Sequence, residues 1–199
     1  MQRSLPHSGN NAYAPDHHGP IAMGAAGWHA HKSVNASAAL YHHAASGCVV
    51  VTDARLQHRD ALARALNLPA DGRLFTDAEL IAYAWLQYGE DCAARLDGDF
   101  VFAVWDPRKL SLFCARDVMG VRPLYLHHAP GHVFAFASQA GALLQLPGVS
   151  RDLDEGRIAD ALTSQLEAVD KTSTFYKTIK RLPPAQWASA RPGHFRQQQ

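Results

Sequence analysis

The sequence predicts an α+β domain in which helices cover an antiparallel sheet. Consecutive apolar residues from Phe100 to Trp105 leave no polar face, which is typical of a strand that is covered on both sides. Further strand candidates follow closely and are joined by short loops with turn-forming residues. Helical spacing of apolar residues occurs before and after these strands. The two kinds of element are therefore grouped along the chain, as in layered α+β folds.

The first half of the chain changes character near residue 48. Residues 1–47 are rich in Gly, Pro, Asn, His and Ala, so we expect them to be dominated by loops. Cys48–Thr52 has the composition of a short strand, and Arg59–Leu66 has helical spacing. Thr76 and Glu79 have the spacing of a capping box, which predicts a helix from residue 77. A short helical turn is expected just after it, before residue 98.

The second half of the chain predicts a meander of strands followed by helices. The loops at residues 106–109 and 128–131 have the length and chemistry of hairpin turns, so we expect adjacent strands to pair antiparallel. Residues 171–199 are expected to be extended, with a frayed end. The strands are expected at Phe100–Trp105, Leu110–Ala115, Pro123–His127 and His132–Ala137, and the helices at Ser138–Leu146 and Asp154–Leu166.

Composition argues against several classes of partner. The chain has 19 Lys and Arg against 18 Asp and Glu, so no charge excess favours nucleic acid. No secretory leader is apparent, and no stretch approaches the roughly 18 uncharged residues that a membrane span needs. The three cysteines are widely separated and lie beside apolar residues, which is typical of buried thiols in a reducing compartment. We therefore expect a cytoplasmic protein with neither a membrane nor a nucleic-acid partner.

The 12 histidines raise the hypothesis of a metal-binding module. His29 and His31 would lie on one face of a strand, where two imidazoles could hold zinc. Because no Cys, Glu or second spaced pair accompanies them, exposed loop histidines are the favoured interpretation, and no metal ligand is assigned.

Four motifs in order resemble the glutaminase (class II glutamine amidotransferase) domain of asparagine synthetases. Residues 96–106 read LDGDFVFAVWD, and RDVMGVRPLY at residues 116–125 resembles the family's RD and G-x-(K/R)-P-L-Y pattern. FASQAGALL at residues 136–144 is similar to F-A-S-E-x-K-A-L-L, and IKRLPP at residues 179–184 resembles I-(K/R)-x-L-P-P-G. The resemblance implies the four-layer αββα sandwich of N-terminal-nucleophile hydrolases.

The resemblance covers nearly the whole chain. It predicts one glutamine amidotransferase type 2-like domain over residues 1–187, and a tail or the start of a linker over residues 188–199.

The resemblance also implies which chemistry to look for. Glutamine hydrolysis in this family needs an N-terminal cysteine whose own amine is the general base. Residue 2 is Gln, and residues 7–11 resemble a segment that normally follows the cysteine by some tens of residues, so we expect the leading strand to be missing and assign no catalytic residue. No Ser-Gly-Gly-x-Asp-Ser loop is present to hold a pyrophosphate, so no cofactor is assigned either.

Two acidic residues are the candidates for binding glutamine. Asp77 matches the position whose carboxylate meets the substrate's amino group in active relatives. Asp53 starts the segment that corresponds to N-G-E-x-x-N, where a carboxylate would repel a developing oxyanion. The family's substrate-binding Arg falls at residues 25–27, which hold no cation. Asp77 is also favoured by the helix dipole by about 0.3–1 kcal/mol without any ligand, and this structural role is the stronger interpretation. Arg116 and Asp117 likewise favour a structural pair over a catalytic one.

Two functional hypotheses from different classes follow. The first is a catalytically inactive glutaminase-like domain that serves as a structural or docking module for an ATP-dependent amide-forming synthetase. Cyclases of lasso-peptide and β-lactam pathways carry such domains, and residues 52–56 resemble that branch. The second is a fragment of a glutamine-hydrolysing asparagine synthetase, which supplies ammonia from glutamine for asparagine biosynthesis.

Overall fold

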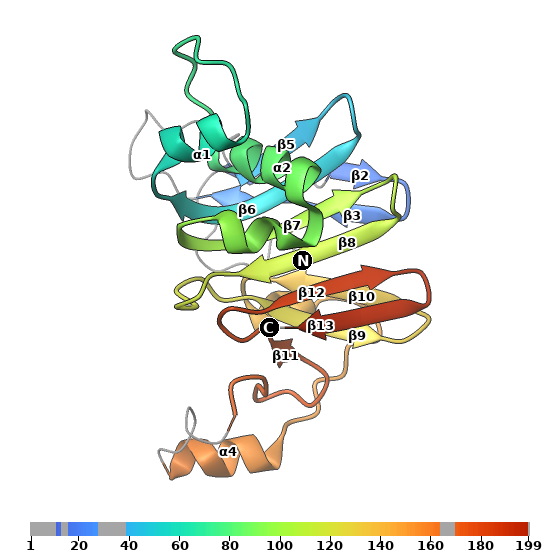
Figure 1. Cartoon of the computed structure of the whole chain (residues 1–199). Coiled ribbons are helices and arrows are strands. Elements are labelled where there is room, and N and C mark those ends of the chain that lie inside the picture. The colour runs from blue at the N-terminus through green and yellow to red at the C-terminus, as the bar shows by residue number, and fades with distance from the viewer. Residues whose placement is uncertain (1–10, 13–15, 28–38, 164–169, 199) are drawn as a thin grey trace.

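The computed structural model describes residues 11–12, 16–27, 39–163 and 170–198. Its strands are β1 (Asn11–Ala12), β2 (Asp16–His18), β3 (Ile21–Met23), β4 (Ala26–Gly27), β5 (Leu40–His43), β6 (Cys48–Leu56), β7 (Gly98–Asp106), β8 (Ser111–Arg116), β9 (Tyr125–Ala129), β10 (Val133–Ala137), β11 (Lys180–Arg181), β12 (Trp187–Arg191) and β13 (His194–Gln198). Its helices are α1 (Arg59–Ala65), α2 (Asp77–Tyr88), the 3-10 helix η3 (Gly89–Arg95), α3 (Ala140–Leu143) and α4 (Glu155–Leu162). Figure 1 shows how they are arranged.

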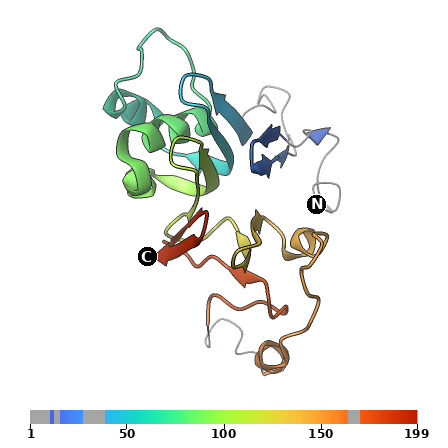
Figure 2. The ribbon, with the colours of Figure 1, turned by 90° about the vertical axis from the view of Figure 1, so that its right-hand side faces the viewer.

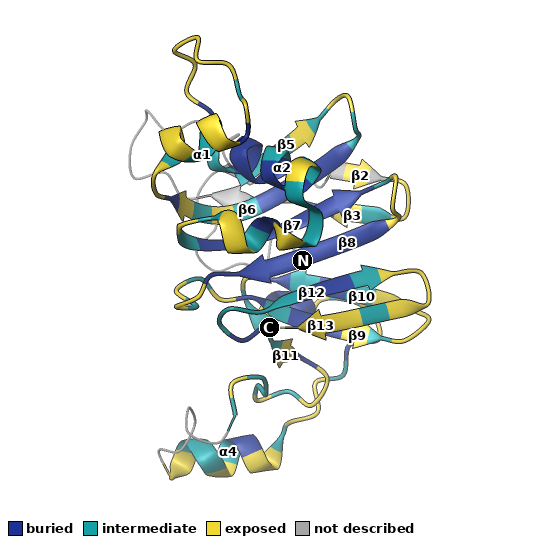
Figure 3. Cartoon of the chain, viewed as in Figure 1, coloured by how far each residue is buried: buried dark blue, intermediate teal, exposed yellow. Residues whose placement is uncertain are grey.

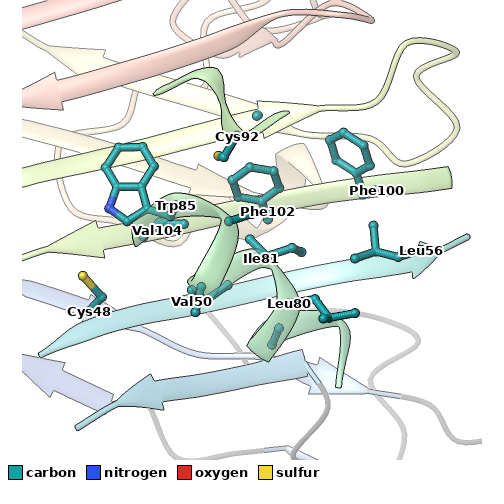
Figure 4. Close-up of a cluster of buried hydrophobic side chains, with 14 of the residues drawn as sticks. Cys48, Val50, Leu56, Leu80, Ile81, Trp85, Cys92, Phe100, Phe102 and Val104 are labelled. Atoms are coloured by element: carbon teal, nitrogen blue, oxygen red, sulfur yellow. The ribbon is translucent and has the colours of Figure 1, made fainter. Parts of the chain in front are cut away.

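Two sheets form the centre of the fold. The larger has six strands in the order β13–β12–β8–β7–β6–β5, and the smaller has three in the order β10–β9–β11. Helix α2 packs on one face of the larger sheet, against side chains of β6 and β7 (Figure 4). Helix α3 packs on β9 and β10 of the smaller sheet. The order helix, sheet, sheet, helix is that of an αββα sandwich.

Strand β7 lies at the middle of the larger sheet and is buried on both faces (Figure 3). Phe100, Phe102 and Val104 pack toward α2. The alternate residues Val101 and Ala103 pack instead with Leu124 and Leu126, at the smaller sheet. The prediction of a doubly covered strand is confirmed, because a strand alternates its side chains between two apolar layers.

The predicted meander is wrong in one respect. The hairpins β7–β8 and β9–β10 pair as expected, but β8 pairs next with β12, while β9 pairs with β11 in the other sheet. The chain leaves the larger sheet at the turn after Arg116. This change of sheet buries Leu126 against the face of β7, which an additional strand in the same plane could not do.

The segment that the sequence predicts to be extended contains two strands near its end. Residues 187–198 form the hairpin β12–β13 at one edge of the larger sheet, with Ala188 paired to Cys114. Phe195 stacks on His128 of the smaller sheet at 4.5 Å between ring centroids. Phe195 also contacts Phe134, and Arg196 lies over the ring of Trp187. Backbone pairing and these ring contacts hold a polar segment that lacks the apolar alternation of a typical strand.

Helix α2 begins where the capping box predicts. The Glu79 amide donates to Thr76 Oγ1 at 3.2 Å, and the Thr76 amide donates to the Glu79 carboxylate at 2.7 Å. Gly89 ends the helix with a positive φ of 62°. None of the described helices is long and apolar enough to cross a membrane.

Thr76→Ala is expected to lower the free energy of unfolding by about 1 kcal/mol, because the first turn of α2 loses an amide acceptor. Urea denaturation checks this value. The matched control is Thr76→Ser, which keeps the hydroxyl and should change stability much less. Equal losses in the two variants would contradict the capping role.

Candidate functional site

Asp77 is the first residue of α2, and its carboxylate already has a cationic partner. Arg59 Nη1 donates to Asp77 Oδ1, and Arg59 Nη2 donates to the carbonyl of Phe75. The backbone of Leu56 provides a further hydrogen bond to the carboxylate. The side chain of Asp77 is only 17% exposed. Burial raises the pKa of this carboxyl above its ordinary value, while the charge of Arg59 and the bond from Leu56 act in the opposite direction.

Asp53 lies on β6, near the end of the strand that also meets Asp77. Its carboxylate is 3.5 Å from Arg122 Nη1, and the two side chains are 55% and 38% exposed. An ion pair this exposed contributes little to stability, at most about 1 kcal/mol. The pair does place the guanidinium of Arg122 beside the carboxylate of Asp53, which we expected from the sequence to repel an oxyanion. The structure therefore brings both candidate residues to one end of β6, each with an arginine.

Arg116 and Asp117 hold the turn between the two sheets through backbone groups. Arg116 Nε donates to the carbonyl of Arg122 at 2.6 Å, and Nη1 donates to the carbonyl of Leu182 at 2.6 Å. The Asp117 carboxylate accepts from the amides of Phe100 at 3.3 Å and Val121 at 3.2 Å. These contacts support the structural interpretation of the pair.

The three cysteines are free thiols inside the two apolar layers. Cys48, Cys92 and Cys114 are all 0% exposed. Burial raises the pKa of each thiol above its ordinary value, to about 12 for Cys92. Cys48 begins β6 and Leu56 ends it, so Cys48 lies roughly 26 Å from the Asp77 end of the strand. None of the three is placed or ionised as a nucleophile for that site.

Several predicted features lie outside the described residues. Residues 7–10 of the segment that resembles the family's H-R-G-P-D, and the histidine pair His29 and His31, are among them. Within the parts of the chain that are described, no group of three or more His, Cys, Asp or Glu side chains could hold a metal ion.

Comparison with known proteins decides the family. The family model described as "Glutamine amidotransferase domain" matches residues 43–199. The chain belongs to this family. Asparagine synthetase [glutamine-hydrolyzing] 3 of Bacillus subtilis is 33% identical to this amidotransferase domain over 122 residues, which are 60% of this chain and 20% of the relative. Putative asparagine synthetase 1 of Methanocaldococcus jannaschii is 39% identical over 87 residues, 42% of this chain and 15% of the relative.

The solved structures support the fold of the amidotransferase domain. Glutamine phosphoribosylpyrophosphate amidotransferase of B. subtilis superposes with a TM-score of 0.50 at 14% identity, covering 80% of this chain and 30% of that one. This likeness confirms the predicted α+β sandwich of the N-terminal-nucleophile type. The amidotransferase domain is thus a class II domain of the asparagine synthetase family, and it spans about a fifth of the length of the curated relatives.

Sequence reasoning missed the two arginines of the amidotransferase domain that contact its candidate acids. Arg59 follows β6 and starts α1, and Arg122 occupies the K/R position of the G-x-(K/R)-P-L-Y motif. Their charge was visible in the sequence, but no local pattern links Arg59 to an aspartate 18 residues away.

Proposed function

We propose that these 199 residues form a glutamine amidotransferase-type module that does not hydrolyse glutamine and serves as a docking partner for an ATP-dependent amide-forming synthetase. One observation supports the lack of glutamine hydrolysis most strongly. The Asp77 carboxylate, which would bind the substrate's amino group, already pairs with the guanidinium of Arg59. Glutamine would have to displace an internal cation that already donates hydrogen bonds to Asp77 and to the carbonyl of Phe75.

The remaining polar groups at this end of β6 support the same proposal. An oxyanion hole needs donors aimed at a developing negative charge. Asp53 places a carboxylate there, and the neighbouring guanidinium of Arg122 already pairs with that carboxylate. The cysteine thiols are buried, and burial raises their pKa values. The described residues thus supply neither an activated nucleophile nor a free site for the substrate's ammonium group.

A docking role is supported by the loop that follows Arg116. Val118 and Met119 are 75% and 79% exposed, and Val121 is 53% exposed. Exposed apolar side chains gathered in one rigid turn are typical of a protein contact. The relatives are named as glutamine-hydrolysing asparagine synthetases, and this chain matches only a part of each. A synthetase domain is therefore the partner that we propose. We place the complex in the cytoplasm.

We also propose that the amidotransferase-type domain continues through β13.

The purified chain is expected to release no ammonia from glutamine above the buffer rate, because neither a thiolate nor an open ammonium subsite is present among the described residues. A coupled ammonia assay measures this. A glutamine analogue with an alkylating group should leave the mass of the chain unchanged in intact mass spectrometry. The matched controls are Asp77→Asn and Cys48→Ser, which should behave like the parent. Turnover that the analogue blocks would overturn the proposal.

A second candidate function is glutamine hydrolysis by a longer protein of which this chain is a part. The partial coverage of relatives that are named as glutamine-hydrolysing favours it. Sequencing the coding DNA on both sides discriminates between the two. An in-frame Met-Cys upstream together with a Ser-Gly-Gly loop downstream would support this candidate, and the ammonia assay would then be repeated on the longer protein.

A further inference from the structure

The strand at one edge of the larger sheet has a free side. β13 is the outermost strand in the order β13–β12–β8–β7–β6–β5, and among the described residues it pairs with β12 alone. Figure 1 shows the hairpin β12–β13 continuing the sheet beyond β8, and Figure 2 shows β13 at the outside of the molecule. An edge strand of this kind presents unpaired backbone groups to which another extended segment can bond.

The register of the hairpin shows which backbone groups of β13 are free. Arg191 and His194 flank a two-residue loop, so they form a hydrogen-bonded pair, and bonded and non-bonded pairs alternate from there. Phe195 and Gln197 lie in the non-bonded pairs, so their N–H and C=O groups point away from β12. No other backbone–backbone hydrogen bond within the described parts of the chain involves these two residues. An extended polypeptide is the ligand whose own backbone groups match this row of donors and acceptors.

A pocket of about 460 Å³ lies beside this edge. Its apolar lining includes Phe100, Val118 and Trp187, and Arg196 and Gln198 of β13 form one of its sides. The guanidinium of Arg196 lies over the ring of Trp187, 5.3 Å from the ring centroid, so this side of the pocket consists of packed side chains. A strand paired with β13 would direct alternate side chains to the face of the sheet where the pocket lies. The volume is within the range of about 300–1,000 Å³ that is usual for ligand pockets, so the pocket can receive an apolar side chain of that strand.

We propose that an extended segment of the synthetase partner adds to the larger sheet along β13 and inserts an apolar side chain into this pocket. The proposal rests on the docking role proposed above and names the surface that would fulfil it. Val118 lines the pocket and also belongs to the exposed loop that supports docking, so the two surfaces are continuous. A second copy of this chain fits less well, because pairing of two β13 strands would bring two Arg196 side chains close together on one face of the sheet.

Titration of the isotope-labelled chain with a short peptide tests the proposal by NMR. The probe is an acetylated and amidated peptide of alternating threonine and leucine residues, which favours an extended backbone and offers apolar side chains on one face. We expect saturable shifts in the amides of residues 194–198 and 116–121. The same peptide N-methylated at every amide has no N–H donors and should not bind. Absence of saturable shifts, or shifts centred on β5 at the other edge of the larger sheet, would overturn the proposal.

Variants of the edge and of the pocket sharpen this test. Gln197→Pro removes an N–H that faces the free side of β13, and it should weaken peptide binding at least about fivefold, because a hydrogen bond is lost and the proline ring blocks the incoming strand. Gln197→Ala keeps the N–H and should bind the peptide much more tightly than Gln197→Pro does. If Gln197→Pro unfolds the hairpin, the comparison of the two peptides on the parent chain decides; unchanged affinity in a folded Gln197→Pro would overturn the proposal.

Val118→Asn should weaken peptide binding about fivefold, because the inserted side chain loses apolar contact. Val133→Asn, at an exposed valine of the smaller sheet, is the matched control and should bind as the parent does. Equal effects of these two variants would contradict insertion into the pocket.

Two further readouts separate this proposal from its alternatives. The ammonia assay tests glutamine hydrolysis without involving β13, so failure of the peptide to bind would overturn docking at this edge and leave the assay's result as it stands. Sedimentation velocity of the parent chain tests pairing with a second copy. A dimer that Gln197→Pro dissociates would overturn the choice of a synthetase segment as the occupant.

Discussion

Arg116→Met is expected to lower the free energy of unfolding by about 4 kcal/mol, the largest effect that we predict for a single substitution. Arg116 is 9% exposed, and its guanidinium donates to the carbonyls of Gly120, Arg122 and Leu182. Leu182 is 66 residues further along the chain, so these bonds join the larger sheet to the segment that follows β11. Methionine fills much of the space but leaves the buried acceptors without donors.

Urea unfolding followed by tryptophan fluorescence measures this loss. Arg116→Lys retains the charge and should recover only part of the stability, because the donors of an ammonium lie on one nitrogen and cannot span the acceptors that Nε, Nη1 and Nη2 of Arg116 contact. Arg64→Met on the exposed face of α1 is the control for loss of an arginine and should change stability by less than about 0.5 kcal/mol. A loss below about 1 kcal/mol for Arg116→Met would show that water replaces the guanidinium.

Asp106→Asn is expected to lower the free energy of unfolding by about 3 kcal/mol at pH 7. The Asp106 carboxylate is completely buried and lies between two donors. Arg108 donates to it with Nε at 2.9 Å and Nη2 at 2.7 Å, and Trp85 Nε1 donates at 3.0 Å. An amide in its place can accept from the indole but cannot pair with both arginine nitrogens.

The stabilisation from Asp106 should depend on pH with a defined sign. Burial by itself would raise the pKa of Asp106, but the hydrogen bonds from Arg108 and Trp85 outweigh it and lower the pKa to about 2. The folded chain therefore binds this proton less readily than the unfolded chain, whose Asp pKa is about 3.9. The contribution, about 2 kcal/mol, should be complete above pH 5 and be lost as the pH falls toward 2.

Denaturation at several pH values checks this dependence. The stability difference between the parent chain and Asp106→Asn should shrink between pH 5 and pH 2. Asp91→Asn, at an exposed position, is the matched control and should show a difference near zero at every pH. A constant difference for Asp106→Asn across this range would contradict the linkage.

The sequence predicted the elements whose causes are local. The capping box at Thr76 and Glu79 defines the start of α2, because both hydrogen bonds join residues three apart. The apolar run through β7 predicted burial on both faces, since alternate side chains need a layer on each side. The sequence did not predict which sheet receives β9, or that residues 194–198 pair at the sheet edge, because backbone pairing and ring contacts between distant segments decide these features.

The sequence by itself determined the family, the central strand, the main helix and the positions of Asp53 and Asp77. Only the tertiary structure decided the partners of these carboxylates: Arg59 pairs with Asp77, and Arg122 lies beside Asp53. The physical reason is the separation along the chain over which each kind of interaction acts. Periodicity and capping act between residues a few positions apart, whereas the partner of a charged side chain is set by packing between segments that are distant along the chain.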